Sequence, residues 1–362
     1  MIRCLLTAVL LGLLCGCGVT PQQRQSLDTY VQAMDQVRTS ADELLTDYAN
    51  TSKPDANAAP DTPTQDFPDE LKLPGDDETP TTEPAKSIAS SRRALGVLRA
   101  YNAALVALAE GRSEAEVRTQ ITGFGGALQS LGSLFGASVP AFAPFAGIGA
   151  SVIKMAQDAT NRKQLELAVE QGREPVAVLL KELENQATAM YRASVVRASQ
   201  AQRKQRDAIR SVAERFGAFL ARHGPPKDAA IVGDAARLQA ELDEIGRKTQ
   251  TREKMPVPFK FGAGKPPLDA ATWGEADLFA QSIRESAQKY ADVALRQNAY
   301  HALLVRYVAA LRHTNASLKA LSASLSAPVP LQVETAQFFG AAFSLRDAIA
   351  VYRNQAPVVP AR

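Results

Sequence analysis

Two of the three cysteines in the 362-residue chain, Cys15 and Cys17, lie one residue apart at the end of an apolar stretch from Leu5 to Leu14. Thiols this close could form a disulfide or share a metal ion. A disulfide across one intervening residue would close a very tight ring, which the usual separation of bridged Cα atoms disfavours. A metal site would need more ligands nearby, and none follow in the sequence. The two cysteines are therefore not predicted to do redox or metal chemistry together.

The histidines do not form a metal-ligand pattern. They are His223, His301 and His313. The last two lie on one predicted helix, too far apart for a local metal pair, and no HExxH motif occurs. His223 falls at a predicted helix end, where the helix dipole favours a cation. We therefore predict no bound metal.

Two short motifs resemble parts of active sites. Ser151 and Lys154 match the SxxK spacing of a serine nucleophile near a lysine, but the SDN and KTG motifs of penicillin-binding enzymes are missing. The loop from Gly262 to Pro266 lacks the preceding strand and the following Ser or Thr of a phosphate-binding loop. Carboxylates are plentiful, but no strand framework brings them together. We therefore predict no catalytic residue, no cofactor and no enzyme activity.

The residues around the two cysteines are typical of a secretory signal peptide. Arg3 precedes the apolar stretch, which is too short to cross a bilayer, since a spanning helix needs about 20 apolar residues. A positive start followed by a short apolar stretch predicts a signal peptide over 1–16. Cys4 would leave with it, so the mature chain would have no disulfide.

The order Leu14-Cys15-Gly16-Cys17 resembles the lipobox of bacterial lipoproteins, although Cys15 stands where Ala or Ser is commoner. The resemblance implies that Cys17 becomes the first mature residue and carries a thioether-linked diacylglycerol and an acylated amine. Each buried acyl CH₂ contributes about 0.8 kcal/mol, so more than one chain anchors a protein stably. An ordinary signal peptide cleaved nearby is the alternative.

The resemblance also implies a location. Gly18, and not an aspartate, follows Cys17, which in lipoproteins of this type resembles delivery to the outer membrane. We therefore expect a lipid-anchored protein of the cell envelope at the outer membrane. The sequence leaves open whether it faces the periplasm or the outside.

Composition favours helices over strands. Hydrophobic residues make up 46% of the chain and aromatic residues only 6%, so Ala, Leu and Val must build the core, whereas strands prefer β-branched and aromatic residues. The predicted parts are a lipidated N-terminus with the first helix (17–50), an acidic Pro-rich linker (51–86), a helical-bundle domain (87–355) and a tail (356–362). The linker has too few large apolar residues to offset its ordering entropy.

Periodicity predicts where the helices lie. The predicted ranges are 21–50, 87–110, 154–171, 173–223, 228–249, 270–327 and 331–353. Ser113 and Glu116 have the spacing of a capping box. In the helix from Ala270, apolar residues recur every seven positions from Ile283 to Leu325, with only Gln297 polar, which is typical of coiled-coil packing against another helix. The predicted fold is an all-α, elongated helical bundle with two helices of about 50 residues and a hydrophobic helical hairpin.

The hairpin is an uncharged segment of 35 residues, 119–153, with seven glycines. Its composition favours a packed core in the middle of the bundle. A membrane-contacting segment and a partner-binding surface remain open. Long helices with a Gly/Ala-rich hydrophobic hairpin resemble, in architecture, the α-pore-forming toxins of the cytolysin A type. Against insertion, the second arm has only thirteen residues before Lys154, too few to span a bilayer.

A basic run extends from Arg192 to Arg222, with eight basic residues against two acidic ones. Its first part, 198–208, is polar nearly all round and is predicted to be a solvated helix. Its second part, from Ile209, has an apolar stripe and is predicted to pack against the acidic helix that contains Glu241. An acidic envelope protein or an anionic envelope polymer stays open as a partner, whereas export argues against nucleic acid.

The leading functional hypothesis is a non-enzymatic outer-membrane lipoprotein, held to the membrane by Cys17, whose helical body is a scaffold or interaction module of the cell envelope. The alternative is a membrane-active helical bundle that inserts the uncharged hairpin, 119–153, into a bilayer.

Overall fold

The computed structural model describes residues 21–51, 88–256, 258–326 and 332–355. The predicted signal peptide with Cys17, the predicted linker from residue 52 onward and the predicted tail, 356–362, lie outside the described residues. Predictions about them are therefore not addressed by the structure.

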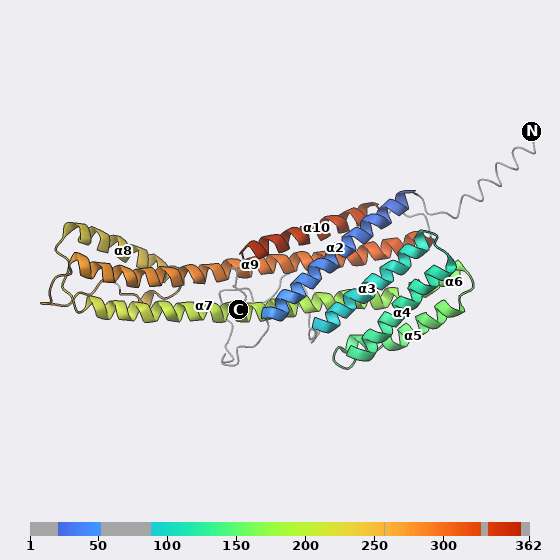
Figure 1. Cartoon of the computed structure of the whole chain (residues 1–362), viewed down its shortest axis with the longest axis horizontal. Helices are drawn as coiled ribbons and strands as arrows, with labels where there is room; N and C mark the ends of the chain where they lie inside the picture. The colour runs from blue at the N-terminus through green and yellow to red at the C-terminus, as the bar shows by residue number, and fades with distance from the viewer. Residues whose placement is uncertain (1–20, 52–87, 257, 327–331, 356–362) are drawn as a thin grey trace, which may run out of the picture. The chain divides into compact units, whose positions relative to one another are not determined.

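The described chain is all-α, as predicted (Figure 1). Its α-helices are α2 (Pro21–Thr51), α3 (Ile88–Ala109), α4 (Glu114–Phe135), α5 (Phe145–Asp158), α6 (Arg162–Glu170), α7 (Arg173–Leu220), α8 (Ala229–Lys248), α9 (Ala270–Ser326) and α10 (Gln332–Gln355). Two short 3₁₀ turns, η2 (Pro140–Phe142) and η3 (Arg252–Lys254), complete the described elements. The two long helices are confirmed: α7 has 48 residues and α9 has 57. These residues form no strand, only one isolated bridge between Gly224 and Pro267.

Side-chain caps lie at two helix starts: the capping box predicted at Ser113, and Asp228, where the sequence predicts a helix to begin. The Ser113 hydroxyl accepts a hydrogen bond from the Glu116 backbone N–H, and the Glu116 carboxylate accepts one from the Ser113 N–H at 3.1 Å, which completes the capping box that begins α4. The Asp228 carboxylate caps α8 by accepting from Ala230 N at 2.8 Å. These local bonds explain why the helix starts were predictable from short motifs.

One predicted helix is wrong. The range 154–171 is two helices, α5 and α6, which are separated at Ala159 and Asn161. The backbone of Asn161 is extended, and its side chain accepts from Gln164 N at 3.1 Å. The helix cannot continue through Asn161, because its extended backbone and capping side chain begin a new helix there. The apolar periodicity continues through 154–171 and therefore does not reveal this break. α5 also begins earlier than predicted, at Phe145.

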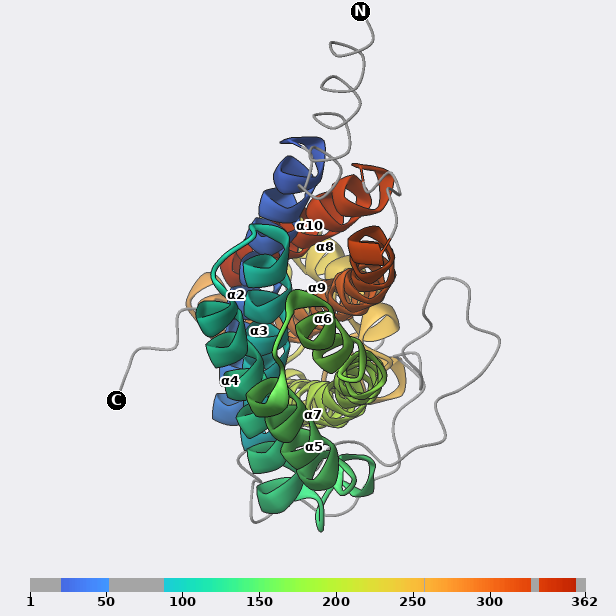
Figure 2. The same cartoon turned by 90° about the vertical axis from the view of Figure 1, so that its right-hand side faces the viewer.

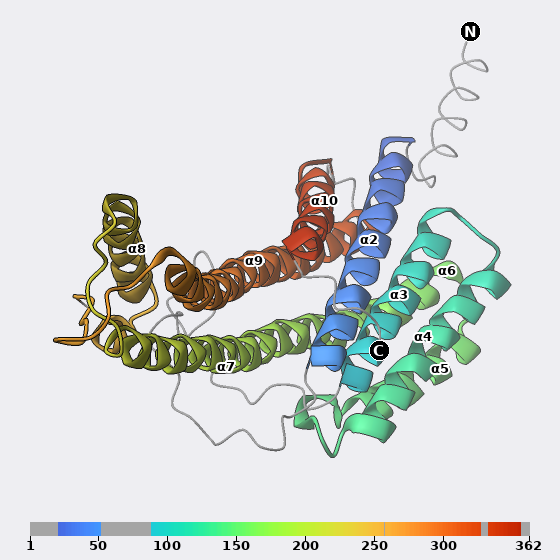
Figure 3. The ribbon, with the colours of Figure 1, turned by 60° about the vertical axis from the view of Figure 1, so that its left-hand side comes forward.

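The chain divides into two compact units. Of the described residues, the first unit comprises 21–51, 88–191 and 301–354, and the second comprises 192–256, 258–300 and Gln355. Both α7 and α9 contribute residues to both units. In the first unit, α2, α3, α4 and α5 lie side by side (Figures 1 and 3), and α10 lies next to α2 (Figures 1 and 2). Tyr30 joins these layers, since its ring packs 5.4 Å from Phe338 and its hydroxyl donates to Asn102 Oδ1 at 2.8 Å.

The heptad positions Ile283, Gln297, Leu304, Leu311 and Leu318 of α9 are buried, Tyr290 is half-buried, and the partner is another helix of the same chain. Ile283, Leu304, Leu311 and Leu318 are at most 2% exposed. In the first unit Arg312 of α9 lies 3.6 Å from Glu184 of α7. In the second unit the amide of Gln297, the polar heptad residue, donates to Ser194 Oγ at 2.9 Å in a buried site. The heptad pattern therefore marks the face of α9 that meets α7.

The core of the second unit joins α7, α8 and α9. The apolar stripe of α7 that begins at Ile209 packs against Leu238 and Leu242 of α8 and against Ile283 of α9. Phe216 lies at the centre of this core, with its ring 5.5 Å from that of Phe259 and 5.7 Å from that of Phe279. The predicted packing of the stripe against the acidic helix is confirmed.

Candidate functional sites

The uncharged segment forms α4, η2 and α5, which pack against one another through backbone contacts at glycines. A Cβ added at Gly125 would lie 2.9 Å from the Gly149 carbonyl oxygen, and one at Gly149 would lie 2.5 Å from Gln129 N. A Cβ at Gly132 would lie 2.9 Å from the Phe142 carbonyl oxygen. Real Cβ atoms do not come this close to backbone, so the two helices can meet only where these positions lack a side chain.

Other glycines of the segment have no such role. A Cβ at Gly123, Gly126 or Gly147 would meet no atom within 4 Å. Gly123 and Gly147 are exposed. Glycine in a helix interior costs about 0.5–1 kcal/mol relative to alanine. These positions therefore lower stability without serving the packing of α4 on α5.

The hairpin is buried on one side only. Its inner side includes Ile121, Phe124, Leu128 and Val152, none of which is exposed. Its outer side is uncharged and carries small residues, with Leu134 61% exposed. The expectation of a hairpin packed in the middle of the bundle is thus correct for one side, because α3 covers α4 there, while the other side faces outward (Figure 3).

The second arm of the hairpin is short for a bilayer. α5 has 14 residues, whereas a spanning helix needs about 20. No helix in the described part of the chain combines the length and the apolar character that crossing a membrane requires.

The first part of the basic run differs from its prediction. Within the polar stretch 198–208, Ser199, Gln202 and Arg206 are buried, with exposed fractions of 5%, 2% and 9%. Arg206 donates to Gln250 Oε1 at 3.4 Å. The prediction of a helix solvated all round is therefore wrong, because tertiary packing covers one side of α7 whose residues are polar.

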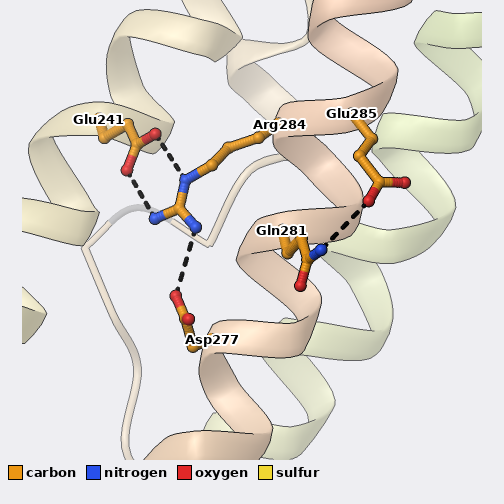
Figure 4. Close-up of polar contacts among 5 residues, drawn as sticks. All are labelled: Glu241, Asp277, Gln281, Arg284 and Glu285. Carbon is orange, nitrogen blue, oxygen red and sulfur yellow. Dashed lines mark hydrogen bonds and ion pairs between the residues drawn. The ribbon is translucent and has the colours of Figure 1, made fainter.

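The acidic residues of α8 pair with two kinds of partner. Glu244 forms ion pairs within α8, with Arg247 and Lys248. Glu241 binds Arg284 of α9 through both carboxylate oxygens, and the same guanidinium lies 3.3 Å from Asp277 (Figure 4). The hydrogen bonds that Arg284 donates lower the pKa of Glu241, and donating them to the two carboxylates raises the pKa of Arg284. A structural network accounts for these shifts.

The residues with motif-like spacing do not assemble into a site. Ser151 and Lys154 are exposed on α5. The ring of His301 packs 5.3 Å from Tyr191, and burial lowers the pKa of His301. Among the described residues, no group of His, Cys, Asp or Glu could hold a metal ion.

The Gly262 loop packs against the end of α7. Gly262 N donates to the His223 carbonyl oxygen at 2.8 Å, and Gly264 has a φ of 69°. This geometry is that of a structural turn, since the loop is held to the backbone by hydrogen bonds and places glycine where a positive φ occurs.

The described residues of the first unit line cavities that the sequence did not predict, among them two of different size. The larger, of about 570 Å³, is lined by α2, α3, α9 and α10. It is lined by three acidic and three basic side chains: Arg92 pairs with Asp42 at 3.2 Å, Arg353 pairs with Glu43 at 3.1 Å, Tyr352 donates to Asp47 at 3.0 Å, and Arg38 is the third basic group. The smaller, of about 230 Å³, lies between α2, α3 and α4 and is lined by three arginines and one aspartate.

Comparisons with protein families, with curated proteins and with solved structures find no match for the chain.

Proposed function

We propose that the chain is a lipoprotein of the bacterial cell envelope, attached to the outer membrane through Cys17, and that its helical body is a non-enzymatic scaffold or interaction module. The observation that carries the proposal is the order Leu14-Cys15-Gly16-Cys17 after Arg3 and an apolar stretch. It supplies an anchor without a spanning helix.

Features of the described body support an interaction role. Long helices present extended surfaces, and several large apolar side chains on them are exposed, among them Leu134, Leu278 and Leu295 at 59–65%. The polar cavities of the first unit offer further places for a ligand.

The anchor is tested by two cysteine variants in a bacterial host with lipoprotein processing. Cys17→Ser removes the thiol that would be acylated, so the protein should move from the membrane fraction to the soluble fraction and no longer incorporate labelled palmitate. Cys15→Ser is the matched control, because it places a common lipobox residue two positions earlier; it should keep both properties. Membrane association and labelling unchanged in Cys17→Ser would refute the anchor.

The partner is sought separately. Cross-linking in intact envelopes, followed by purification of the anchored protein, should recover one envelope component in proportion to the protein, and recovery of none at several cross-linker lengths would count against the scaffold role.

The second candidate function is a membrane-active bundle, which the uncharged outer side of α4 and α5 favours. Leakage of a dye from liposomes by the chain lacking residues 1–17 would support it. Leu134→Asp places a charge on the outer side of the hairpin and should abolish leakage if the hairpin inserts. Absence of leakage and of liposome binding by the unchanged chain would rule this function out.

A further inference from the structure

The smaller cavity has an apolar floor built by two facing helices. α2 contributes Val31 and Met34, and α3 contributes Ala103 and Val106. Residues three positions apart lie on the same side of a helix, so each pair faces the same space. The floor offers an apolar body a place out of water, at a volume of about 230 Å³, enough for a molecule of a few carbon atoms in length.

The rim of the same cavity is cationic. Arg38, Arg99 and Arg112 line it, and Asp35 is the one acidic residue among the described residues that do so. Arg112 is paired with Glu110 at 2.7 Å. Arg99 forms no hydrogen bond or ion pair with any residue that the structure describes. The charge at the rim therefore exceeds what the described carboxylates neutralise.

One of the cavity's guanidinium groups has a buried donor without an acceptor. This group is Arg38, which lines both cavities: its Nε is covered from solvent and makes no hydrogen bond, and Asp35 Oδ1 lies 3.7 Å from it. A buried donor left unsatisfied costs free energy, which an acceptor supplied by a bound molecule would recover. Asn102 adds a polar group to the wall, and its amide oxygen already accepts from Tyr30.

We propose that this cavity binds a small amphipathic anion, a single carboxylate or phosphate group on a short apolar body. The anionic group lies between Arg38 and Arg99, where it accepts charge-assisted hydrogen bonds, and the body lies along Met34 and Ala103. The larger cavity is not the site, because the acidic and basic groups that line it already neutralise one another.

Titration calorimetry of the full chain with octanoate tests the proposal. Octanoate should bind, 1-octanol should bind at least about tenfold more weakly because it lacks the charge, and inorganic phosphate should also bind at least about tenfold more weakly because it lacks the apolar body. Equal binding of octanoate and 1-octanol would overturn the proposal. Octyl phosphate distinguishes the sources: tighter binding than octanoate identifies a phosphate ligand, and weaker binding a carboxylate.

Variants locate the site. Arg99→Gln should weaken octanoate binding about tenfold or more, whereas Arg93→Gln, an exposed arginine of the same helix outside the cavity, and Arg353→Gln, at the larger cavity, should leave it unchanged. Equal losses in Arg99→Gln and Arg93→Gln would show attraction to charge in general and overturn the proposal.

A second variant tests the floor without changing charge. Ala103→Leu fills part of the cavity, so octanoate binding should fall while the weak binding of inorganic phosphate stays the same. Circular dichroism and thermal unfolding of each variant show that the helices remain folded. Unchanged octanoate binding in a folded Ala103→Leu protein would contradict the proposed place of the apolar body.

Discussion

Arg284 of α9 binds Glu241 of α8 through two parallel hydrogen bonds, Nε to Oε1 at 2.7 Å and Nη2 to Oε2 at 2.8 Å. The two residues are 43 positions apart in the chain. Both side chains are about 40% exposed, so water screens the pair, but the bidentate geometry is the strongest that an arginine and a carboxylate can form. The pair joins α8 to α9 beside the core of the second unit (Figure 4).

Glu241→Gln should lower the free energy of unfolding at pH 7 by about 0.5–1 kcal/mol, the upper part of the range for exposed ion pairs. Because the folded pKa of Glu241 lies below the ordinary glutamate value, its contribution is present above that value and is lost as the pH falls through the lowered pKa. Urea unfolding at pH 7 and pH 3 should therefore show a larger difference at pH 7 than at pH 3. Glu285→Gln is the control: it removes a carboxylate charge that accepts from the neutral Gln281, keeps an oxygen that can accept, and should have a smaller effect. A pH-independent difference would argue against the ion pair.

Glycines of the hairpin should fall into two classes when replaced by alanine. Gly149→Ala places a Cβ 2.5 Å from Gln129 N and should destabilise the protein by about 1–3 kcal/mol, because backbone has to move. Gly147→Ala, two residues away in the same helix and exposed, should stabilise it by about 0.5–1 kcal/mol. Thermal unfolding of the two variants measures both signs. The same sign for both would mean that α4 and α5 do not cross as described.

The buried hydrogen bond between Gln297 and Ser194 should couple the effects that mutations of these two residues have on the free energy of unfolding. Ser194→Ala leaves the Gln297 amide without its acceptor and should cost about 1–2 kcal/mol. Gln297→Leu combined with Ser194→Ala removes both polar groups at a heptad position and should restore or raise stability. A double-mutant cycle by denaturant unfolding gives the coupling between the two side chains, and additive effects would contradict the bond.

Glu182 of α7 should lower stability at neutral pH. It is 7% exposed, and burial raises its pKa even though Asn185 and Lys181 act in the opposite direction. A raised folded pKa favours the folded state below the ordinary glutamate value, and this advantage is lost as the pH rises through the folded pKa. Glu182→Gln should therefore stabilise the protein at pH 7, by an amount of order 1 kcal/mol, and by less at pH 4. Glu214→Gln, an exposed position of the same helix, should change neither value appreciably; a stabilisation in both variants would point to net charge as the cause.

The local sequence was enough to predict most of the helices and many of their ends. Ser113 with Glu116 and Asp228 mark helix starts because a capping side chain bonds to backbone only two or three residues away. The seven-residue spacing from Ile283 marks the buried face of α9 because a helix repeats its faces at that interval. Asn161 shows the limit of such patterns: the apolar periodicity predicts one helix over 154–171, but this residue caps a new helix and divides the range into α5 and α6.

The sites were decided by tertiary structure. Which glycines are indispensable depends on where α4 crosses α5, and sequence spacing does not separate Gly147 from Gly149. Polar residues such as Gln202 are buried because packing covers one side of α7, although the stretch looked solvated. The cavity of Arg38 and Arg99 brings together two helices that are separated in the chain by residues 52–87, so no local pattern could have indicated it.

By itself, the sequence determined an all-helical chain, its two long helices and their buried faces, and it contains the Leu14–Cys17 order from which the anchor is proposed. These features depend on backbone hydrogen bonds, periodicity and short motifs, all of which act over a few residues. Only the tertiary structure decided which helices meet, which charges pair and where a cavity remains, because these contacts join residues tens of positions apart through the shapes of whole helices.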